Sequence, residues 1–300
     1  MKTAVYISLA CILLGVCLFT VGMSLVGFDL RTLRPIYTAE TVYIEEAFDA
    51  VSVDTVEHDV RFILTEDETC KLVYTKTDRL SLHAAVENGT LRITRTDSRA
   101  WYEKIGFFYG KFELAVYLPR AAYKTLFAKS TSGDVEVPLG FLAGKAELAS
   151  TSGDVCFHGE AETLIAKSTS GDVKICGDGV QKSSSIHAST ISGNVTVEKA
   201  VGTDFVCTAV SGDVLLDAIR ADGSLYAETT GGDIVFAHAV AVENAECKTV
   251  SGDVRGTLAK AMRFTADTVS GSIRFPDSDT QGGTFRAKTT SGDVSISLAE

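Results

Sequence analysis

Hydrophobic and polar residues alternate over short stretches of this chain, and one motif recurs between the stretches. "KSTSGDV" occurs at Lys129–Val135 and again at Lys167–Val173, and variants such as "TAVSGDV" and "KTTSGDV" follow. Apolar residues stand seven and five positions before each motif glycine and two and four positions after it, with Gly256 as the exception. Since successive strand residues face opposite sides, this pattern predicts two short strands in each repeat, both with one buried face.

The repeat has a nearly constant length. Successive motif glycines, from Gly133 to Gly292, lie 18 to 22 residues apart. A period near twenty indicates a solenoid, a propeller or an array, and a propeller blade needs four strands and about twice this length. We therefore predict an all-β fold, a single-stack β-solenoid (β-helix-like) of about 20-residue two-strand rungs, stacked about 4.8 Å apart.

Each "SGD" triplet is predicted to form the corner of a rung. Glycine supplies backbone angles that other residues avoid, and Asp, Asn and Ser side chains hydrogen-bond to nearby backbone groups. The predicted turn residues are Gly133, Asp134, Gly153, Asp154, Gly171, Asp172, Gly193, Asn194, Gly212, Asp213, Gly232, Asp233, Gly252, Asp253, Gly271, Gly292 and Asp293. Weaker copies of the pattern around His58 and Gly89 predict degenerate rungs that begin near residue 41.

An aromatic insertion interrupts the weak copies. Residues 101–112, "WYEKIGFFYGKF", contain six aromatic side chains. One interpretation is a hydrophobic cover over the open end of the solenoid, which otherwise exposes unpaired strand groups. The other is a loop that contacts a partner or a membrane, and its candidate contact residues are Trp101, Tyr102, Phe107, Phe108 and Tyr109.

Residues 4–28 carry no charge and form the one long apolar segment. A helix of this length spans about 37 Å, enough to cross a hydrocarbon core of about 30 Å. A cleaved signal peptide is the alternative, but its apolar core is shorter and ends at a small-residue cleavage site, which is missing here. Lys2 precedes the segment and Arg31 and Arg34 follow it, so the positive-inside rule is nearly balanced. We expect a single-pass anchor whose short N-terminal tail stays in the cytoplasm.

These patterns divide the chain into four parts. We predict a short tail at 1–3, a transmembrane anchor helix at 4–28, a linker at 29–40 and the β-strand-repeat solenoid at 41–300. Within the solenoid, residues 41–120 hold the degenerate rungs with the aromatic insertion 101–112, and residues 121–300 hold nine regular repeats.

The charge and the motif inventory exclude several function classes. The net charge of −11 repels phosphate backbones, so we expect no nucleic-acid partner. The column of corner aspartates could bridge Ca²⁺, but Ca²⁺ takes six to eight oxygens and each rung supplies one carboxylate. None of the five histidines pairs with another at metal-binding spacing, and G-x-S-x-G is absent. We expect no catalytic residues, no cofactor, no metal ligand and no small-molecule substrate.

The seven cysteines bear on the compartment. Cys207 and Cys247 share the inward phase two rungs apart, about 9.6 Å, which exceeds disulfide reach and predicts buried thiols. Cys156 and Cys176 face outward on adjacent rungs, where a strained bridge is conceivable. Free thiols are unusual in an exported domain, so they argue against an extracytoplasmic orientation.

Several segments resemble one known family. "FDAVSVDT" at Phe48–Thr55, "NGTLRI" at Asn88–Ile93, "VYLP" at Val116–Pro119 and the "TSGDV" copies resemble the bacterial β-strand-repeat adhesins, the family called domain of unknown function 4097. The resemblance covers about residues 41–300 and implies a solenoid-like β domain, often on a membrane anchor, with no catalytic or binding residues to carry over. His58, Gly231 and Ser272 depart from the repeat motif.

Three hypotheses follow. The first is a non-enzymatic, membrane-anchored cell-surface adhesin or envelope-interaction module, bound to the membrane through residues 4–28 and to a protein or surface polymer through an outer face or the insertion. The second is a cytoplasm-facing scaffold or sensor module of an envelope-stress system. The third, less favoured, is a polysaccharide-active β-helix enzyme, which requires an acidic cluster that the repeat does not predict.

Overall fold

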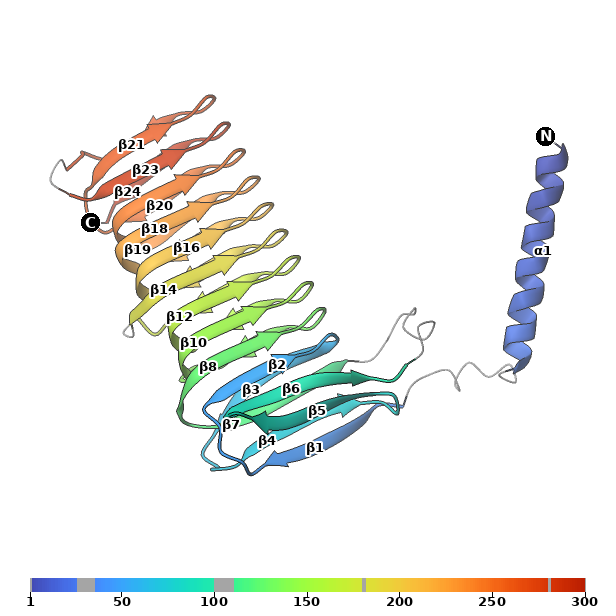
Figure 1. Ribbon diagram of the computed structural model, residues 1–300. Helices are drawn as coiled ribbons and strands as arrows, with labels where there is room; N and C mark the ends of the chain where they lie inside the picture. Colours follow the sequence, from blue (N-terminus) through green and yellow to red (C-terminus); the bar gives the residue numbers. More distant parts are fainter. Residues whose placement is uncertain (1, 26–35, 100–110, 180–181, 280–281, 300) are drawn as a thin grey trace.

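The computed structural model describes residues 2–25, 36–99, 111–179, 182–279 and 282–299. One helix, α1 (Lys2–Leu25), precedes a long stack of strands (Figure 1). In chain order the strands are β1 (Thr38–Ile44), β2 (Ala50–Asp54), β3 (His58–Thr65), β4 (Cys70–Lys76), β5 (Leu80–Glu87), β6 (Thr90–Asp97), β7 (Phe112–Pro119), β8 (Ala122–Lys129), β9 (Val135–Val137), β10 (Leu142–Ala149), β11 (Val155–Phe157), β12 (Glu160–Lys167), β13 (Val173–Cys176), β14 (Lys182–Ser189), β15 (Val195–Glu198), β16 (Val201–Thr208), β17 (Val214–Asp217), β18 (Arg220–Glu228), β19 (Ile234–Lys248), β20 (Val254–Leu258), β21 (Arg263–Asp267), β22 (Ile273–Arg274), β23 (Thr284–Lys288) and β24 (Val294–Leu298).

Each regular rung contributes one strand to each of two parallel sheets. In the broad sheet, which contains the longer strands, β10 pairs in register with β8 and β12. In the narrow sheet, β11 pairs in register with β9 and β13. β19 runs without a break from the narrow sheet into the broad one. It pairs with β17 of the narrow sheet at one end and with β18 of the broad sheet at the other. The predicted β-solenoid of two-strand rungs is confirmed.

The core lies between the two sheets and consists of the inward columns predicted from the alternation. Leu126, Ala166 and Cys207 of the broad sheet and Val135 and Val214 of the narrow sheet are all at most 1% exposed. Burying one Val or Leu side chain stabilises a fold by about 1.5–3 kcal/mol. Because every rung adds several such side chains, the stack is held together by contacts between neighbouring rungs.

The order of rungs in space departs from chain order at the C-terminal end. The last rung in the chain, β23–β24, lies between two earlier ones: β23 pairs with β19 and β21, and β24 pairs with β20 and β22. The rung formed by β21 and β22 is therefore outermost, as Figure 1 shows at the upper end of the stack. Phe275 stacks on Phe264 at a ring distance of 5.0 Å, and the Phe264 amide donates to the Ser278 hydroxyl. These contacts cover the outermost rung, β21–β22.

The N-terminal end mirrors this arrangement. The first rung, β2–β3, lies between the β6–β7 rung and the β8–β9 rung, with all of these pairings parallel. Outside them, β1, β4 and β5 run antiparallel to their neighbours. The first and the last two-strand rungs of the chain are thus each inserted between two other rungs near an end of the stack.

The weak copy around Gly89 does not form the expected rung. β5 and β6 form an antiparallel hairpin, and Asn88 and Gly89 make its turn with φ of 51° and 74°. Asn-Gly is the preferred pair for a two-residue hairpin turn, because both positions need positive φ. β6 ends at Asp97 and β7 begins at Phe112, so the aromatic insertion stands in the chain between these two strands.

Candidate functional site

The predicted corner glycines form one column along an edge of the stack, but for a different physical reason than expected. None of them has positive φ; among the described glycines, only Gly89, Gly140, Gly179 and Gly256 do. A Cβ on any corner glycine would instead lie 1.9 to 2.3 Å from a carbonyl oxygen of the neighbouring rung. Glycine is therefore required by the close approach of two backbones, not by the backbone angles of the turn.

The corner aspartates form a continuous hydrogen-bonded ladder. The Asp154 amide donates to Asp134 Oδ1 at 2.8 Å, and the Asp172 amide donates to Asp154 Oδ1 at 2.8 Å. The same bond repeats along the stack, starting from Asp59 and including Asn194. Its last donor is the Ser272 amide, which donates to Asp293 Oδ1 at 2.7 Å. Ser272 thus replaces Asp on the outermost rung, where no further amide needs an acceptor.

A second ladder lies just inside the first. The Ser150 hydroxyl donates to the Gly133 carbonyl at 2.9 Å and accepts from the Gly153 amide at 3.0 Å. Ser168 repeats both bonds, and Thr249 repeats the first on later rungs. These hydroxyls are buried, and an unpaired buried polar group is costly, so the ladder satisfies the corner backbone. The repeated polar residues hold rungs to one another, and among the described residues no group of three His, Cys, Asp or Glu side chains could hold a metal ion.

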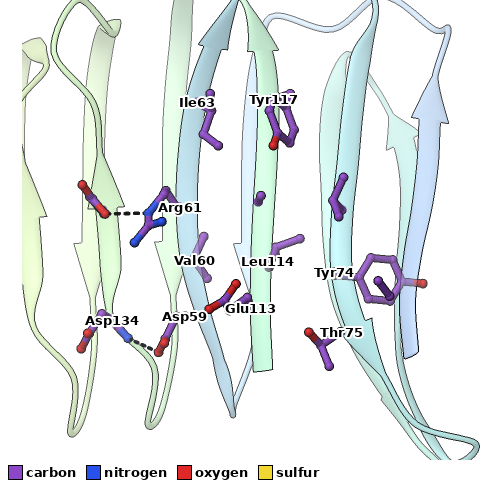
Figure 2. A pocket seen from close by; sticks show the side chains of 14 residues that line it. Asp59, Val60, Arg61, Ile63, Tyr74, Thr75, Glu113, Leu114, Tyr117 and Asp134 are labelled. Carbon is purple, nitrogen blue, oxygen red and sulfur yellow. Dashed lines mark hydrogen bonds and ion pairs between the residues drawn. The ribbon is translucent and has the colours of Figure 1, made fainter. Parts of the chain in front are cut away.

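A groove of about 380 Å³ opens on the outer face of the narrow sheet near its N-terminal end (Figure 2). Its floor is Ala115 of β7, a small side chain between Arg61 of β3 and Val73 of β4 in the same row. Tyr117 and Ile63 form an apolar side of the groove. The hollow exists because a small residue stands where both neighbouring strands carry larger ones.

The other side of the groove is acidic. Asp59, Glu113 and Asp134 line it, and the fourth carboxylate, Glu136, pairs with Arg61 at 2.8 Å. These groups leave a net negative charge, because four carboxylates face one guanidinium. The groove therefore favours a cationic group over an anionic one.

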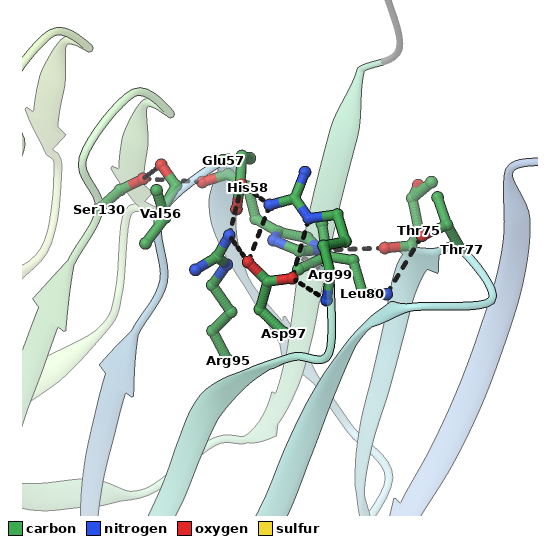
Figure 3. Close-up of polar contacts among 10 residues, drawn as sticks. All are labelled: Val56, Glu57, His58, Thr75, Thr77, Leu80, Arg95, Asp97, Arg99 and Ser130. Carbon is green, nitrogen blue, oxygen red and sulfur yellow. Dashed lines mark hydrogen bonds and ion pairs between the residues drawn. The ribbon is translucent and has the colours of Figure 1, made fainter. Parts of the chain in front are cut away.

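A cluster of buried charges lies at the root of the insertion (Figure 3). Arg95 contacts Glu57 at 2.7 Å and Asp97 at 2.6 Å, and Arg99 contacts the same two carboxylates at 2.9 and 2.8 Å. Hydrogen bonds from Arg99 hold the pKa of Asp97 well below its usual range. The cluster therefore ties Arg99, which directly precedes residues 100–110 in the chain, to Glu57 and to Asp97 at the end of β6.

His58 occupies the corner position of the first rung and is fully buried. Its Nε2 lies 2.9 Å from the Thr75 carbonyl, and its Nδ1 has no hydrogen-bond partner among the described residues. Burial lowers the pKa of His58, although the bond to Thr75 acts in the opposite direction. The ring also packs on Phe112 at 5.2 Å, so His58 is a structural member of this end.

Residues 101–110 of the predicted contact segment lie outside the described residues, but its last residue is placed. Phe112 begins β7, is 4% exposed and contacts Tyr37 with ring centroids 5.3 Å apart. Tyr37 directly precedes β1, the first strand after the linker from α1. The insertion and the linker therefore meet the stack at the same end.

The cysteine side chains lie on the faces of the sheets that the alternation predicted. Cys207 and Cys247 are buried, and burial raises the pKa of Cys207 to about 12. Cys156 and Cys176 are half-buried and unbridged, and burial raises the pKa of Cys176 to about 11. Such high pKa values make a thiol a poor nucleophile.

The sequence matches the family described as Toastrack DUF4097 over residues 48–239 and 219–300. A solved structure from Parabacteroides merdae, described as a "putative adhesin", is 13% identical, with a TM-score of 0.52, and the match covers 87% of this chain and 96% of that one. Another adhesin so described, from Bacteroides fragilis, is 15% identical with a TM-score of 0.47 and covers 88% and 99% of the two chains. No curated protein matches the sequence. The structure from Parabacteroides merdae shares the fold.

Proposed function

Because the chain belongs to the Toastrack DUF4097 family, we propose that it is a non-enzymatic, membrane-anchored cell-surface protein that contacts other molecules through the outside of its β-stack. The observation that carries the proposal is that one apolar helix precedes, in the same chain, a stack whose repeated Ser, Thr and Asp side chains hydrogen-bond to neighbouring rungs. The helix contains the segment Tyr6–Ser24, long and apolar enough to cross a membrane. The names of the structural relatives, which refer to adhesion, agree with a surface role.

Anchoring rather than secretion is supported by the length of the helix. It covers Lys2–Leu25, which corresponds to about 36 Å at 1.5 Å per residue. The apolar part of a signal peptide is usually about 7–15 residues long. We infer a linker at 29–40 that joins this anchor to the N-terminal end of the solenoid, 41–300.

The aromatic insertion is the proposed contact segment. Its side chains Trp101, Tyr102, Phe107, Phe108 and Tyr109 are of the kind enriched both at protein interfaces and at membrane surfaces. Its root at Phe112 contacts Tyr37, at the point where the chain arrives from the anchor. Either a partner protein or the headgroup region therefore suits this segment.

The competing proposal is a cytoplasm-facing scaffold or sensor module, and one observation favours it. All seven cysteines are free, including the buried Cys70, Cys207 and Cys247. Exported domains usually pair their cysteines, whereas the cytoplasm keeps thiols reduced.

A protease-accessibility experiment separates the two proposals. A specific cleavage site is engineered into residues 26–35, because a solenoid resists general proteases, and intact cells are treated and blotted for the C-terminal half. We expect cleavage in intact cells, with lysed cells and an uncleavable site as controls. Protection until lysis overturns the surface proposal and supports the cytoplasmic one.

A further inference from the structure

A second groove, of about 490 Å³, lies at the opposite end of the stack from β1. It opens on the outer face of the broad sheet, across β18, β19, β23 and β21, which Figure 1 shows side by side at the upper end. Its volume is in the range of pockets that bind small ligands. We call it the distal groove. It exists in this form only because β23 is inserted between β19 and β21.

The centre of the distal groove is a guanidinium without a partner. Arg286 of β23 stands beside Glu246 of β19 on one side and Thr265 of β21 on the other. Glu246 pairs with Lys248 at 2.8 Å instead. Arg286 makes no ion pair or hydrogen bond with any residue in the described part of the chain, although most arginines there do. A guanidinium presents five donors in a planar fork that matches a carboxylate.

Uncharged hydrogen-bonding groups and one further arginine stand beside this guanidinium. The next row across the groove, on four neighbouring strands, consists of Ser224, Asn244, Thr284 and Arg263. The Thr284 hydroxyl donates to Asn244 Oδ1 at 2.9 Å, which orients the Asn244 amide group. Tyr226 closes the groove, and its own hydroxyl donates to Glu228 at 2.6 Å. A ligand that meets this lining must carry hydroxyls as well as an anionic group.

We propose that the distal groove binds a carboxylated polysaccharide, a chain that contains uronic acid residues, with its carboxylate on Arg286 and its hydroxyls on the Asn244 and Thr284 row. Charge complementarity selects this occupant: the groove is lined by two guanidiniums, Arg286 and Arg263, and by one carboxylate, Glu246, which pairs with Lys248. The lining is therefore locally cationic in a protein of net charge −11, enough for isolated carboxylates but not for a dense polyanion. An acidic peptide lacks the hydroxyls that the uncharged row would recognise. The site lies on the outer rungs at the end of the stack opposite β1.

The proposal deepens the surface-contact function and is tested on the purified full-length chain in zwitterionic nanodiscs, which makes the result independent of membrane orientation. Binding of oligogalacturonate at 150 mM salt, an ionic strength chosen to screen distant charges, is measured calorimetrically. The test variant is Arg286→Gln. The matched control is Arg274→Gln, which removes another exposed arginine, from the adjacent rung on the opposite sheet.

We expect saturable binding that Arg286→Gln weakens at least about tenfold, since a hydrogen bond to a charged group contributes at least about that factor. Arg274→Gln and the wild type should agree within about twofold, and the neutral methyl ester should bind as weakly as oligogalacturonate binds Arg286→Gln. No binding, or equal weakening by both variants, overturns the site. Equal affinity for poly-aspartate overturns the assignment to a polysaccharide. Failure here leaves the protease-accessibility result unaffected.

Discussion

The middle of the stack and its two ends use the same two-strand rung but assemble it by different rules. Between Gly133 and Gly252, rungs follow one another in space as they do in the chain. At each end, the terminal rung of the chain is inserted between two others, and strands or loops absent from the middle cover what remains. A repeat motif therefore determines how a rung stacks but not where the stack stops.

The side chains that differ between these regions show how the ends are specified. Middle rungs carry Asp or Asn at the corner because each must offer an acceptor to the next amide. The outermost rung carries Ser272, whose amide donates to Asp293 Oδ1, and its side chain offers no acceptor to a further rung. At the other end, buried charges and His58 replace the plain Ser-Gly corner. Ends are thus built from residues that break the repeat.

The largest expected effect comes from breaking the middle. In Gly212→Ala, the new Cβ would lie 1.9 Å from the Gly193 carbonyl oxygen, so two rungs must separate. We expect a loss of about 3 kcal/mol or more in the free energy of unfolding. Gly231→Ala is the control, because its Cβ meets nothing closer than 3.7 Å, and should change stability by about 0.5 kcal/mol or less. Thermal unfolding followed by circular dichroism measures both, and equal effects would contradict the steric account of the corner.

The next effect tests the charge cluster at the N-terminal end. Asp97→Asn removes one of two carboxylates that hold Arg95 and Arg99, and breaking a buried pair costs about 3 kcal/mol. Glu136→Gln breaks the exposed pair with Arg61 and should cost at most about 1 kcal/mol. The comparison uses the same unfolding measurement. If the two variants lost the same stability, the cluster would contribute no more than a surface pair.

A pH series tests the role of His58 at the same end of the stack. His58 has its pKa lowered by burial, so the folded state resists protonation more than the unfolded state does. The contribution of neutral His58 to the free energy of unfolding is fully present above the pKa of an unfolded histidine, about 6.5. It is lost as the pH falls from there toward the lower pKa of the folded state. We expect the loss to be at most about 1.4 kcal/mol for each pH unit in that window. The His58→Gln variant should lose less stability than the wild type between pH 7 and pH 5, and parallel curves would exclude His58 as the cause.

The smallest effect concerns the last step of the corner ladder. Asp293→Ala leaves the Ser272 amide without its acceptor and should cost about 1 kcal/mol. Ser272→Ala keeps the amide donor and removes only the hydroxyl, which also hydrogen-bonds to Asp293, so it should cost less than Asp293→Ala. Asp293→Asn keeps the acceptor, as Asn194 does naturally, and should restore most of the loss. A larger cost for Ser272→Ala than for Asp293→Ala would mean that the ladder continues past Ser272.

The sequence predicted the rung because every rung repeats the same contacts. Alternation identified the inward Leu126 and Val135 columns, and the period excluded a propeller. It predicted corner glycines but not their reason, because the distance between two backbones is a property of the stack. The hairpin at Asn88 and Gly89 carried a recognisable turn signal that the weak repeat pattern obscured.

The order of the end rungs and the distal groove could not be predicted. If the rungs stacked in chain order, Thr265 would lie beside Glu246, whereas the structure places Arg286 there. Nothing in the periodicity distinguishes these arrangements, because both rungs offer the same inward pattern. The one local signal was Ser272, whose missing carboxylate has an explanation only once the spatial order is known.

The most direct test of this account is to determine which residue lies beside Lys248 in the broad sheet. In a chain with its native cysteines replaced by alanine, one variant carries Lys248→Cys with Lys288→Cys, and a second carries Lys248→Cys with Asp267→Cys. Lys248 and Lys288 are direct partners about 4.8 Å apart, within disulfide range, whereas Asp267 lies one rung farther, about 9.6 Å away. We predict rapid disulfide formation on mild oxidation in the first variant and none in the second. The reverse result would show that the rungs stack in chain order and would contradict the insertion of the terminal rung.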